Sequence, residues 1–177
     1  MESSKRITYL DIEVKKAIIQ EIDSIWNMFE QGIAKRKREG SLQWQDGYPN
    51  RNTILADIEK DYGYVVTYKN EICGYFALIF DIEPAYEAIE GVWLNNNDYG
   101  VIHRLVTNQE RKVKGLAESI LLKIEKLVKK KNRYEIKVDT NFDNHAMLYL
   151  FDKLGYQYCG EVYFRGSARR AFQKSLA

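Results

Sequence analysis

A short basic turn carries the most informative chemistry in the sequence. Lys112 and Lys114 lie on either side of one position, and Gly115 follows just before a helix expected from Leu116. Residues 101–107 have the β-branched and apolar composition of a buried strand. A strand that leads through such a turn into a helix forms an anion site, because unpaired amide groups and the positive end of the helix dipole meet there. The pattern predicts a phosphate-bearing ligand.

The elements expected around this turn alternate between strands and helices. Hydrophobic periodicity predicts strands at residues 14–19, 64–68, 72–80, 101–107, 135–139, 156–164 and 169–174, and helices at residues 23–39, 52–62, from 116 onward and 144–154. Asp143 is the expected N-cap of the last helix. Two turns, at residues 69–71 and 166–167, are expected to close hairpins. This order predicts an α/β (or α+β) fold with a mixed sheet, in one domain over residues 13–177 after an N-terminal extension at residues 1–12.

Composition excludes several classes of protein. The chain has 177 residues, of which 45% are apolar and 29% charged, as in a globular domain. A net charge of +2 argues against a nucleic-acid partner. The absence of a membrane-length apolar run and of a signal peptide predicts a cytoplasmic protein with no membrane partner. Cys73 and Cys159 are expected to be buried reduced thiols, and with His103 and His145 they lack metal-ligand spacing, so no metal is expected.

Three segments resemble one enzyme family. Residues 112–117, KVKGLA, fit the pattern Q/R-x-x-G-x-G/A with lysine at the first place, which resembles the acyl-CoA pyrophosphate loop of the GNAT N-acyltransferase superfamily. Residues 144–156, NHAMLYLFDKLGY, resemble its fourth-helix motif, and residues 17–29 resemble its opening strand and helix. The resemblance covers roughly residues 13–176. It implies a mostly antiparallel central sheet, about four helices and a splayed cofactor cleft between the central strands.

The resemblance implies that acetyl-CoA is the cosubstrate and lies between the strands at residues 101–107 and 135–139. Backbone groups of Leu105 and Thr107 would bind the pantetheine, and amides of residues 113–117 would hold the pyrophosphate. Gly115 would let the backbone approach the phosphate closely, and the Ser119 hydroxyl would add a further contact. The full expected set is Leu105, Val106, Thr107, Lys112, Val113, Lys114, Gly115, Leu116, Ala117, Glu118, Ser119, Asn144 and Phe151.

The catalytic groups are less defined than the donor site. Acetyl transfer to an amine needs a base and often an acid for the leaving thiolate. The position of the family's tyrosine acid is Phe151, which cannot donate a proton, and Tyr149 is about 200° away around the helix. The thiolate is therefore expected to leave free. The candidate bases are His103, Glu83 and Glu90; a water-relayed base is equally open.

Two aromatic segments are expected to form the acceptor pocket, one at residues 41–50 and one at residues 81–98. Carboxylates in the second segment, Glu83 and Glu90, would attract a cationic amine. A polyamine, an aminoglycoside, an amino acid, a peptide N-terminus and a lysine all remain open as acceptors. The expected pocket residues are Trp44, Gln45, Tyr48, Tyr86 and Trp93.

The resulting interpretation is an N-acetyltransferase that moves acetyl from acetyl-CoA to a primary amine of a small molecule or peptide by direct attack in a ternary complex. The alternative is an acyl-CoA-binding module of the same fold that performs no chemistry, as a sensor or structural subunit. A nucleic-acid-binding domain that uses Lys112, Lys114 and residues 129–131 is disfavoured by the near-neutral charge. The final strand pair, if exposed, would suit a homodimer.

Overall fold

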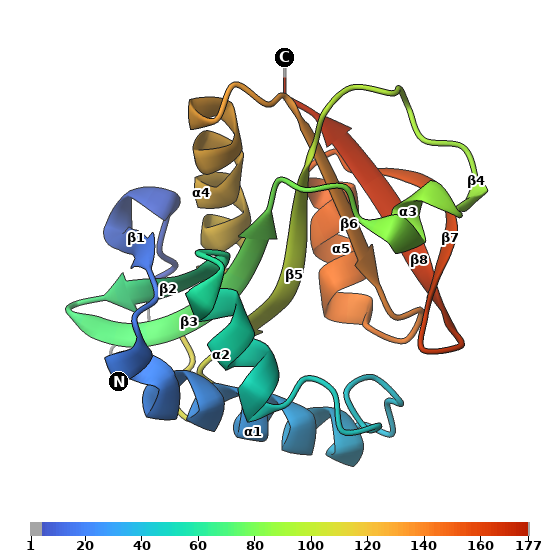
Figure 1. Ribbon diagram of the computed structural model, residues 1–177. Helices are drawn as coiled ribbons and strands as arrows, with labels where there is room; N and C mark the ends of the chain where they lie inside the picture. Colours follow the sequence, from blue (N-terminus) through green and yellow to red (C-terminus); the bar gives the residue numbers. More distant parts are fainter. Residues whose placement is uncertain (1–4, 177) are drawn as a thin grey trace. The chain divides into compact units, whose positions relative to one another are not determined.

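The computed structural model describes residues 5–176, and within them the chain folds into eight strands and five α-helices (Figure 1). The hydrogen-bonded strand order is β1-β2-β3-β5-β6-β8-β7-β4. The β5–β6 pair is parallel, whereas the pairs β1–β2, β2–β3, β6–β8, β7–β8 and β4–β7 are antiparallel. The expected mixed, mostly antiparallel sheet is confirmed. Backbone contacts divide the chain into two compact units, Met1–Leu78 with Arg104–Ile124 and Ile79–His103 with Glu125–Ala177.

The first unit is built on an antiparallel sheet and amphipathic helices. The sheet elements are β1 (Ile12–Lys16), β2 (Gly63–Tyr68), most of β3 (Glu71–Ile79) and the second half of β5 (Gly100–Thr107), and the helices are α1 (Ile22–Arg38), α2 (Arg51–Glu59) and the first part of α4 (Leu116–Lys130). One face of α1 buries Ile25 and Phe29 against Trp44, Val65 and Tyr75. The β2–β3 hairpin turns at Lys69 and Asn70 with φ of 50° and 64°, as in a two-residue turn that matches the strand twist.

The second unit contains the remaining strands. Its elements are α3 (Pro84–Glu87), β4 (Glu90–Gly91), the first half of β5, the end of α4, β6 (Glu135–Thr140), α5 (His145–Lys153), β7 (Gln157–Phe164) and β8 (Ser167–Ser175). β5 and β6 pair at residues 100–102 and 136–138. One core gathers Tyr86, Tyr99, Val101, Val162 and Ala171.

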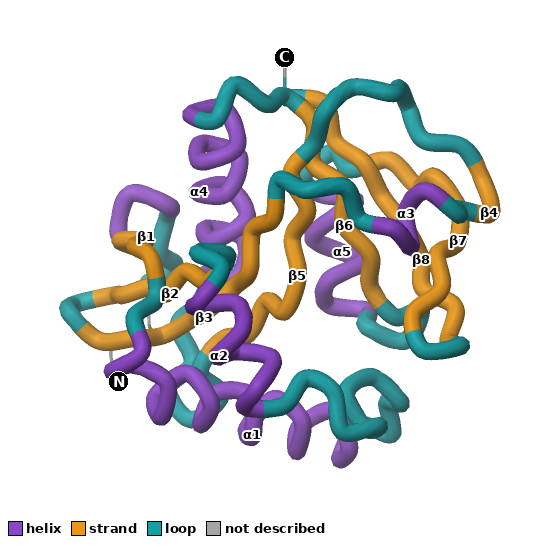
Figure 2. The backbone as a smooth tube through the Cα atoms, in the orientation of Figure 1, coloured by secondary structure: helices purple, strands orange, loops and turns teal. Residues whose placement is uncertain are grey.

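Several expected boundaries were wrong. β1 begins at Ile12, inside the expected extension, and α2 ends at Glu59. The expected loop at residues 81–98 contains α3 and β4, because Pro84 suits a first helical turn and the Glu83 carboxylate accepts from the Ala85 amide at 3.3 Å. Loop backbone remains over residues 92–99 and over residues 39–50 (Figure 2). The N-cap of α5 is Asn144 in place of Asp143.

Both cysteines are free and buried, as expected. Burial raises the pKa of the Cys73 thiol to about 11 and also raises the pKa of Cys159. Both therefore remain protonated near neutral pH, and neither is an activated nucleophile. Across residues 5–176, no helix combines the length and apolar character that crossing a bilayer requires.

Candidate active site

The basic turn at residues 112–117 leads into α4 as expected. Its glycine, Gly115, also packs against the N-terminal segment, residues 6 and 7. Gly115 has φ of 85°, and a Cβ built there would lie 2.9 Å from Ile7 O and 2.9 Å from Arg6 Cγ. The Ile7 amide also donates to Lys114 O at 3.0 Å. The sequence predicted that the missing side chain of Gly115 lets phosphate approach the backbone. The structure shows that it lets the N-terminal segment approach.

The N-terminal segment also alters the charge beside the turn. Arg6 forms an ion pair with Glu118, the third residue of α4. A carboxylate in the first turn of a helix would oppose a bound anion, and the Arg6 guanidinium offsets it. The Ser119 hydroxyl, expected to contact phosphate, is buried and donates to Gly115 O at 2.7 Å. That hydroxyl therefore donates to the helix backbone, and its oxygen keeps the capacity to accept a hydrogen bond.

Gly115→Ala should destabilise the protein by about 1–2 kcal/mol more than Gly40→Ala, because a methyl group at Gly115 meets backbone as well as an unfavourable φ. Gly40 is a matched control, since it has φ of 74° and nothing within 4 Å of a built Cβ. Urea denaturation of the two variants measures the difference. Equal losses would show that the contact with Arg6 and Ile7 does not matter.

The strand that precedes the turn has its own local contacts. Gln109 Nε2 donates to Thr107 O at 3.1 Å and to Thr107 Oγ1 at 3.0 Å, and the Gln109 amide donates to Gln31 Oε1 at 2.8 Å. Thr107 O was expected to bind pantetheine, and its second lone pair can still accept from a ligand. Val106 and Leu116 are buried. They can contact a ligand only through their backbone.

A basic depression adjoins the turn. It has a volume of about 270 Å³ and is lined by Lys35, Arg38, Glu39, Gln109 and Lys112. The cations at the end of α1 were interpreted as helix-terminal charges, and Gly40 does follow that helix with φ of 74°. Three of the depression's four charged side chains are cationic, which favours anions at this side of the turn.

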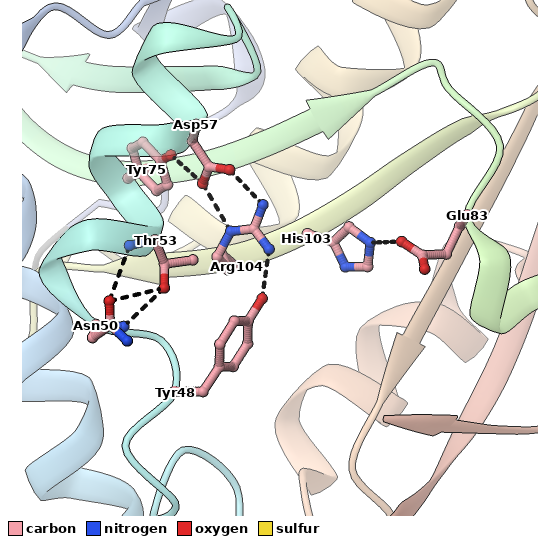
Figure 3. A network of polar contacts seen from close by, with 8 residues as sticks. All are labelled: Tyr48, Asn50, Thr53, Asp57, Tyr75, Glu83, His103 and Arg104. Carbon is pink, nitrogen blue, oxygen red and sulfur yellow. Dashed lines mark hydrogen bonds and ion pairs between the residues drawn. The ribbon is translucent and has the colours of Figure 1, made fainter. Parts of the chain in front are cut away.

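A buried polar network occupies the interior of the first unit (Figure 3). Arg104 donates to both carboxylate oxygens of Asp57, at 2.8 and 2.6 Å, and to the Tyr48 hydroxyl at 2.6 Å. The Tyr75 hydroxyl donates to Asp57 at 2.8 Å. Tyr48 thus meets a guanidinium. Trp44, by contrast, is buried against Phe29.

Gln45, the remaining expected pocket residue of this loop, is exposed. Its Nε2 donates to Ile33 O at 3.0 Å and to Gln43 O at 3.2 Å. Gln45 therefore ties the loop to α1, and of the three pocket residues expected here only Tyr48 joins the polar network.

In the second unit, two of the three candidate bases meet. His103 Nε2 lies 3.0 Å from Glu83 Oε2, and the side chains are 14% and 21% exposed, so both remain accessible (Figure 3). The Glu83 amide donates to the Tyr99 hydroxyl at 3.2 Å. The His103 ring centroid is 6.2 Å from that of Tyr86 and 6.0 Å from that of Phe164. A histidine held by a carboxylate between aromatic rings is an arrangement suited to proton transfer.

The third candidate base lies elsewhere. Glu90 is exposed on β4 and accepts from the Tyr163 hydroxyl at 2.9 Å. This surface contact gives Glu90 no link to His103, whose carboxylate partner is Glu83. The structure therefore supports His103 with Glu83 over Glu90.

Tyr86 and Trp93, the expected pocket residues of this unit, are tied into its core. The Tyr86 hydroxyl donates to Asp139 at 2.6 Å, and Trp93 Nε1 donates to Tyr86 O at 2.9 Å. Burial, and then the Asp139 carboxylate, raise the pKa of Tyr86 well above its usual value, so the phenol stays protonated. Lys137 Nζ lies 4.3 Å from the Trp93 ring centroid, which shows that this ring already contacts a cation.

The α5 residues have structural partners. Asn144 Oδ1 accepts from the Met147 amide at 3.3 Å, and its Nδ2 donates to Thr140 Oγ1 at 3.1 Å. Phe151 is 1% exposed and packs on Tyr156 and Phe172, whereas Tyr149 is 65% exposed. Tyr149 thus faces away from Phe151, as the helical geometry predicted.

Sequence reasoning missed several residues that the structure brings into these networks. They are Arg6, Asp57, Tyr75, Arg104, Asp139 and Phe164. For two of these residues the sequence contained a sign of their role. Asp57 interrupts the apolar residues of α2, and Arg104 interrupts the apolar run of β5. A charge in a buried run implies a partner. The partner itself is far away in the sequence.

The fold defines a class: an open, mostly antiparallel α/β sheet in which β5 leads through a basic turn into α4. Residues 22–156 match the family model described as the acetyltransferase (GNAT) family. The chain belongs to the GNAT acetyltransferase family.

Solved structures agree with this assignment. A GNAT-family acetyltransferase from Streptococcus agalactiae is 36% identical, with 93% of this chain and 95% of that chain covered and a TM-score of 0.83. A GNAT-family acetyltransferase from Listeria monocytogenes is 18% identical, with 93% and 95% covered and a TM-score of 0.74. A Salmonella typhimurium protein solved with its cofactor acetyl-CoA is 12% identical, with 94% and 95% covered and a TM-score of 0.66. Functionally curated proteins gave no match to the sequence.

Proposed function

We propose that this protein transfers acetyl from acetyl-CoA to a primary amine of a small molecule or peptide. The observation that carries the proposal is the pair formed by His103, on β5, and Glu83, the N-cap residue of α3. Family membership supplies the reaction class. The Salmonella typhimurium structure supports acetyl-CoA as the donor through its fold.

Donor binding is assigned to the strand end and the basic turn of the first unit. Backbone groups of Leu105 and Thr107 would bind the pantetheine. The amides of residues 113–118, with Lys112 and Lys114, would bind the pyrophosphate, because a helix start attracts anions. Arg6 would keep Glu118 from repelling the pyrophosphate. Asn144 and Phe151 belong to the second unit, where Asn144 is the N-cap of α5 and Phe151 is buried.

In the proposed chemistry, the amine nitrogen attacks the thioester carbonyl carbon, and His103 accepts the amine proton. A C–N bond forms, the C–S bond breaks, and the CoA thiolate leaves with protonation by water. If His103 donates to Glu83 through Nε2, its lone pair is on Nδ1, which is then the proton acceptor. Phe151 supplies no acid, and a free thiolate is an adequate leaving group.

The acceptor is proposed to be an amine that binds as the ammonium ion and releases one proton to solvent before its nitrogen attacks. Glu83 offers negative charge, and aromatic rings contact ammonium groups favourably. Trp93, in the same unit as Glu83, is the proposed aromatic contact, and the buried Tyr86 accepts a hydrogen bond from its indole N–H. The buried Trp44 and the α1-bound Gln45 would act by shaping the loop that carries Tyr48.

The test is CoA release, followed with a thiol reagent, from acetyl-CoA and a panel of a polyamine, an aminoglycoside, amino acids, a peptide N-terminus and a peptide lysine. The two buried cysteines should contribute little background. Turnover with one class that His103→Gln abolishes supports the proposal. Tight acetyl-CoA binding without turnover for any acceptor would favour the non-catalytic module.

A further inference from the structure

We propose that Arg104 is a positioning residue that couples the donor-binding strand end to the loop at residues 41–50. The proposal rests on the proposed function for the identity of the donor. The groups it uses, Tyr48, Asp57, Tyr75, Arg104 and residues 105–107, all belong to the first unit. It assigns Arg104 no proton transfer and no contact with substrate.

The backbone of Arg104 is the first reason. Arg104 has φ of 54° within β5, a left-handed conformation that a non-glycine residue in a strand adopts only when its surroundings enforce it. The next residue, Leu105, begins the segment assigned to pantetheine binding. The direction of that segment therefore depends on whatever holds Arg104 in place.

The side chain supplies the enforcing contacts. Nε and Nη2 of Arg104 bond the two Asp57 oxygens, and Asp57 is itself 4% exposed. The fully buried Tyr75 hydroxyl donates a third hydrogen bond to that carboxylate. Such a two-pronged pair fixes the plane of the guanidinium as well as its position. The Arg104 guanidinium is thus fixed in both position and orientation.

The remaining nitrogen of the fork reaches the loop. Nη1 of Arg104 donates to the Tyr48 hydroxyl at 2.6 Å, and Tyr48 lies in the segment between α1 and α2 (Figure 3). The loop has further hydrogen bonds, from Gln45 to Ile33 and Gln43, but these reach α1 and the loop itself. The Tyr48 contact is therefore a direct hydrogen bond through which a shift of β5 would be transmitted to the loop.

This arrangement makes a specific prediction about ligand response. When CoA orders residues 105–107, Arg104 should be held more firmly, and Tyr48 with its loop should be ordered with it. Binding at one site then favours binding at the other, because coupling free energies are reciprocal. A merely structural Arg104 would stabilise the fold without this response.

Amide hydrogen exchange of the full chain, with and without CoA, tests the proposal. In the wild type, CoA should slow exchange of residues 41–50 by about fivefold or more. Tyr48→Phe removes the hydroxyl contact and should abolish this protection while protection of residues 113–118 remains. Arg104→Lys keeps the positive charge but loses the planar guanidinium, and it should also abolish the protection of residues 41–50. Arg51→Lys is the matched control, because Arg51 pairs with the exposed Asp23.

Tyr48→Phe keeps the test decisive even if Arg104→Lys fails to fold. Protection of residues 41–50 that persists in Tyr48→Phe, or that is absent in the wild type despite CoA binding, would overturn the proposal. Calorimetric titration of CoA is run alongside. Absence of CoA binding to the wild type would count against the proposed function itself, which separates the two failures.

Discussion

Replacing His103 with glutamine is expected to lower kcat for acetyl transfer by about 10²–10⁴-fold, the usual contribution of a positioned general base. Glutamine preserves much of the side-chain volume and can still bond Glu83, but it cannot take the amine proton. The KM for acetyl-CoA should change little, because donor binding is assigned to backbone and the basic turn. Steady-state kinetics with a saturating acceptor measures both quantities.

Two further variants make this expectation specific. Glu83→Gln should lower kcat by less, because the His103 ring remains while the charge that stabilises its protonated form is lost. Glu90→Gln should leave kcat unchanged, since Glu90 contacts Tyr163 at the surface. If His103→Gln keeps the wild-type kcat, His103 is not the base, and a water molecule takes that role.

Replacing Asp57 with alanine is expected to destabilise the protein by about 3–5 kcal/mol, because it leaves a buried guanidinium without its counterion. The Arg104 side chain is 10% exposed and that of Asp57 is 5% exposed, so water cannot replace the lost carboxylate. The same change removes the acceptor of the Tyr75 hydroxyl. Urea denaturation, with the transition midpoint and slope, measures the loss.

Asp23 provides the matched control. It pairs with Arg51, also in the first unit, but its side chain is 84% exposed. Exposed ion pairs contribute at most about 1 kcal/mol, so Asp23→Ala should have a small effect. Similar losses for Asp23→Ala and Asp57→Ala would mean that burial of the Arg104 pair does not set its importance.

Much of the local structure could be predicted from the sequence. The three- and four-residue spacing in α1 and α4, and the β-branched runs of β2, β3, β5 and β6, each encode an element through contacts between near neighbours. The basic turn before α4 was located for the same reason, since strand, glycine and helix are consecutive. The hairpin turn at Lys69 and Asn70 was also expected, and its left-handed backbone is typical of two-residue turns.

The secondary structure predicted from the sequence was wrong where the elements are too short to show a hydrophobic period. α3 has four residues and β4 has two, too few for a hydrophobic pattern to be detected. The expected loop at residues 81–98 therefore contained structure. The hydrogen bond from the Ser119 hydroxyl to Gly115 O was not predicted either, because it depends on how the start of α4 packs.

Residues close together in the chain encode the order of the longer elements, the position of the basic turn and the lack of a tyrosine acid at Phe151. Which polar side chains meet depends on the tertiary structure. His103 and Glu83 are 20 residues apart, Arg104 and Asp57 are 47 apart, and Arg6 and Glu118 are 112 apart. Periodicity specifies which face of an element is buried, whereas pairing between distant side chains depends on strand register and packing.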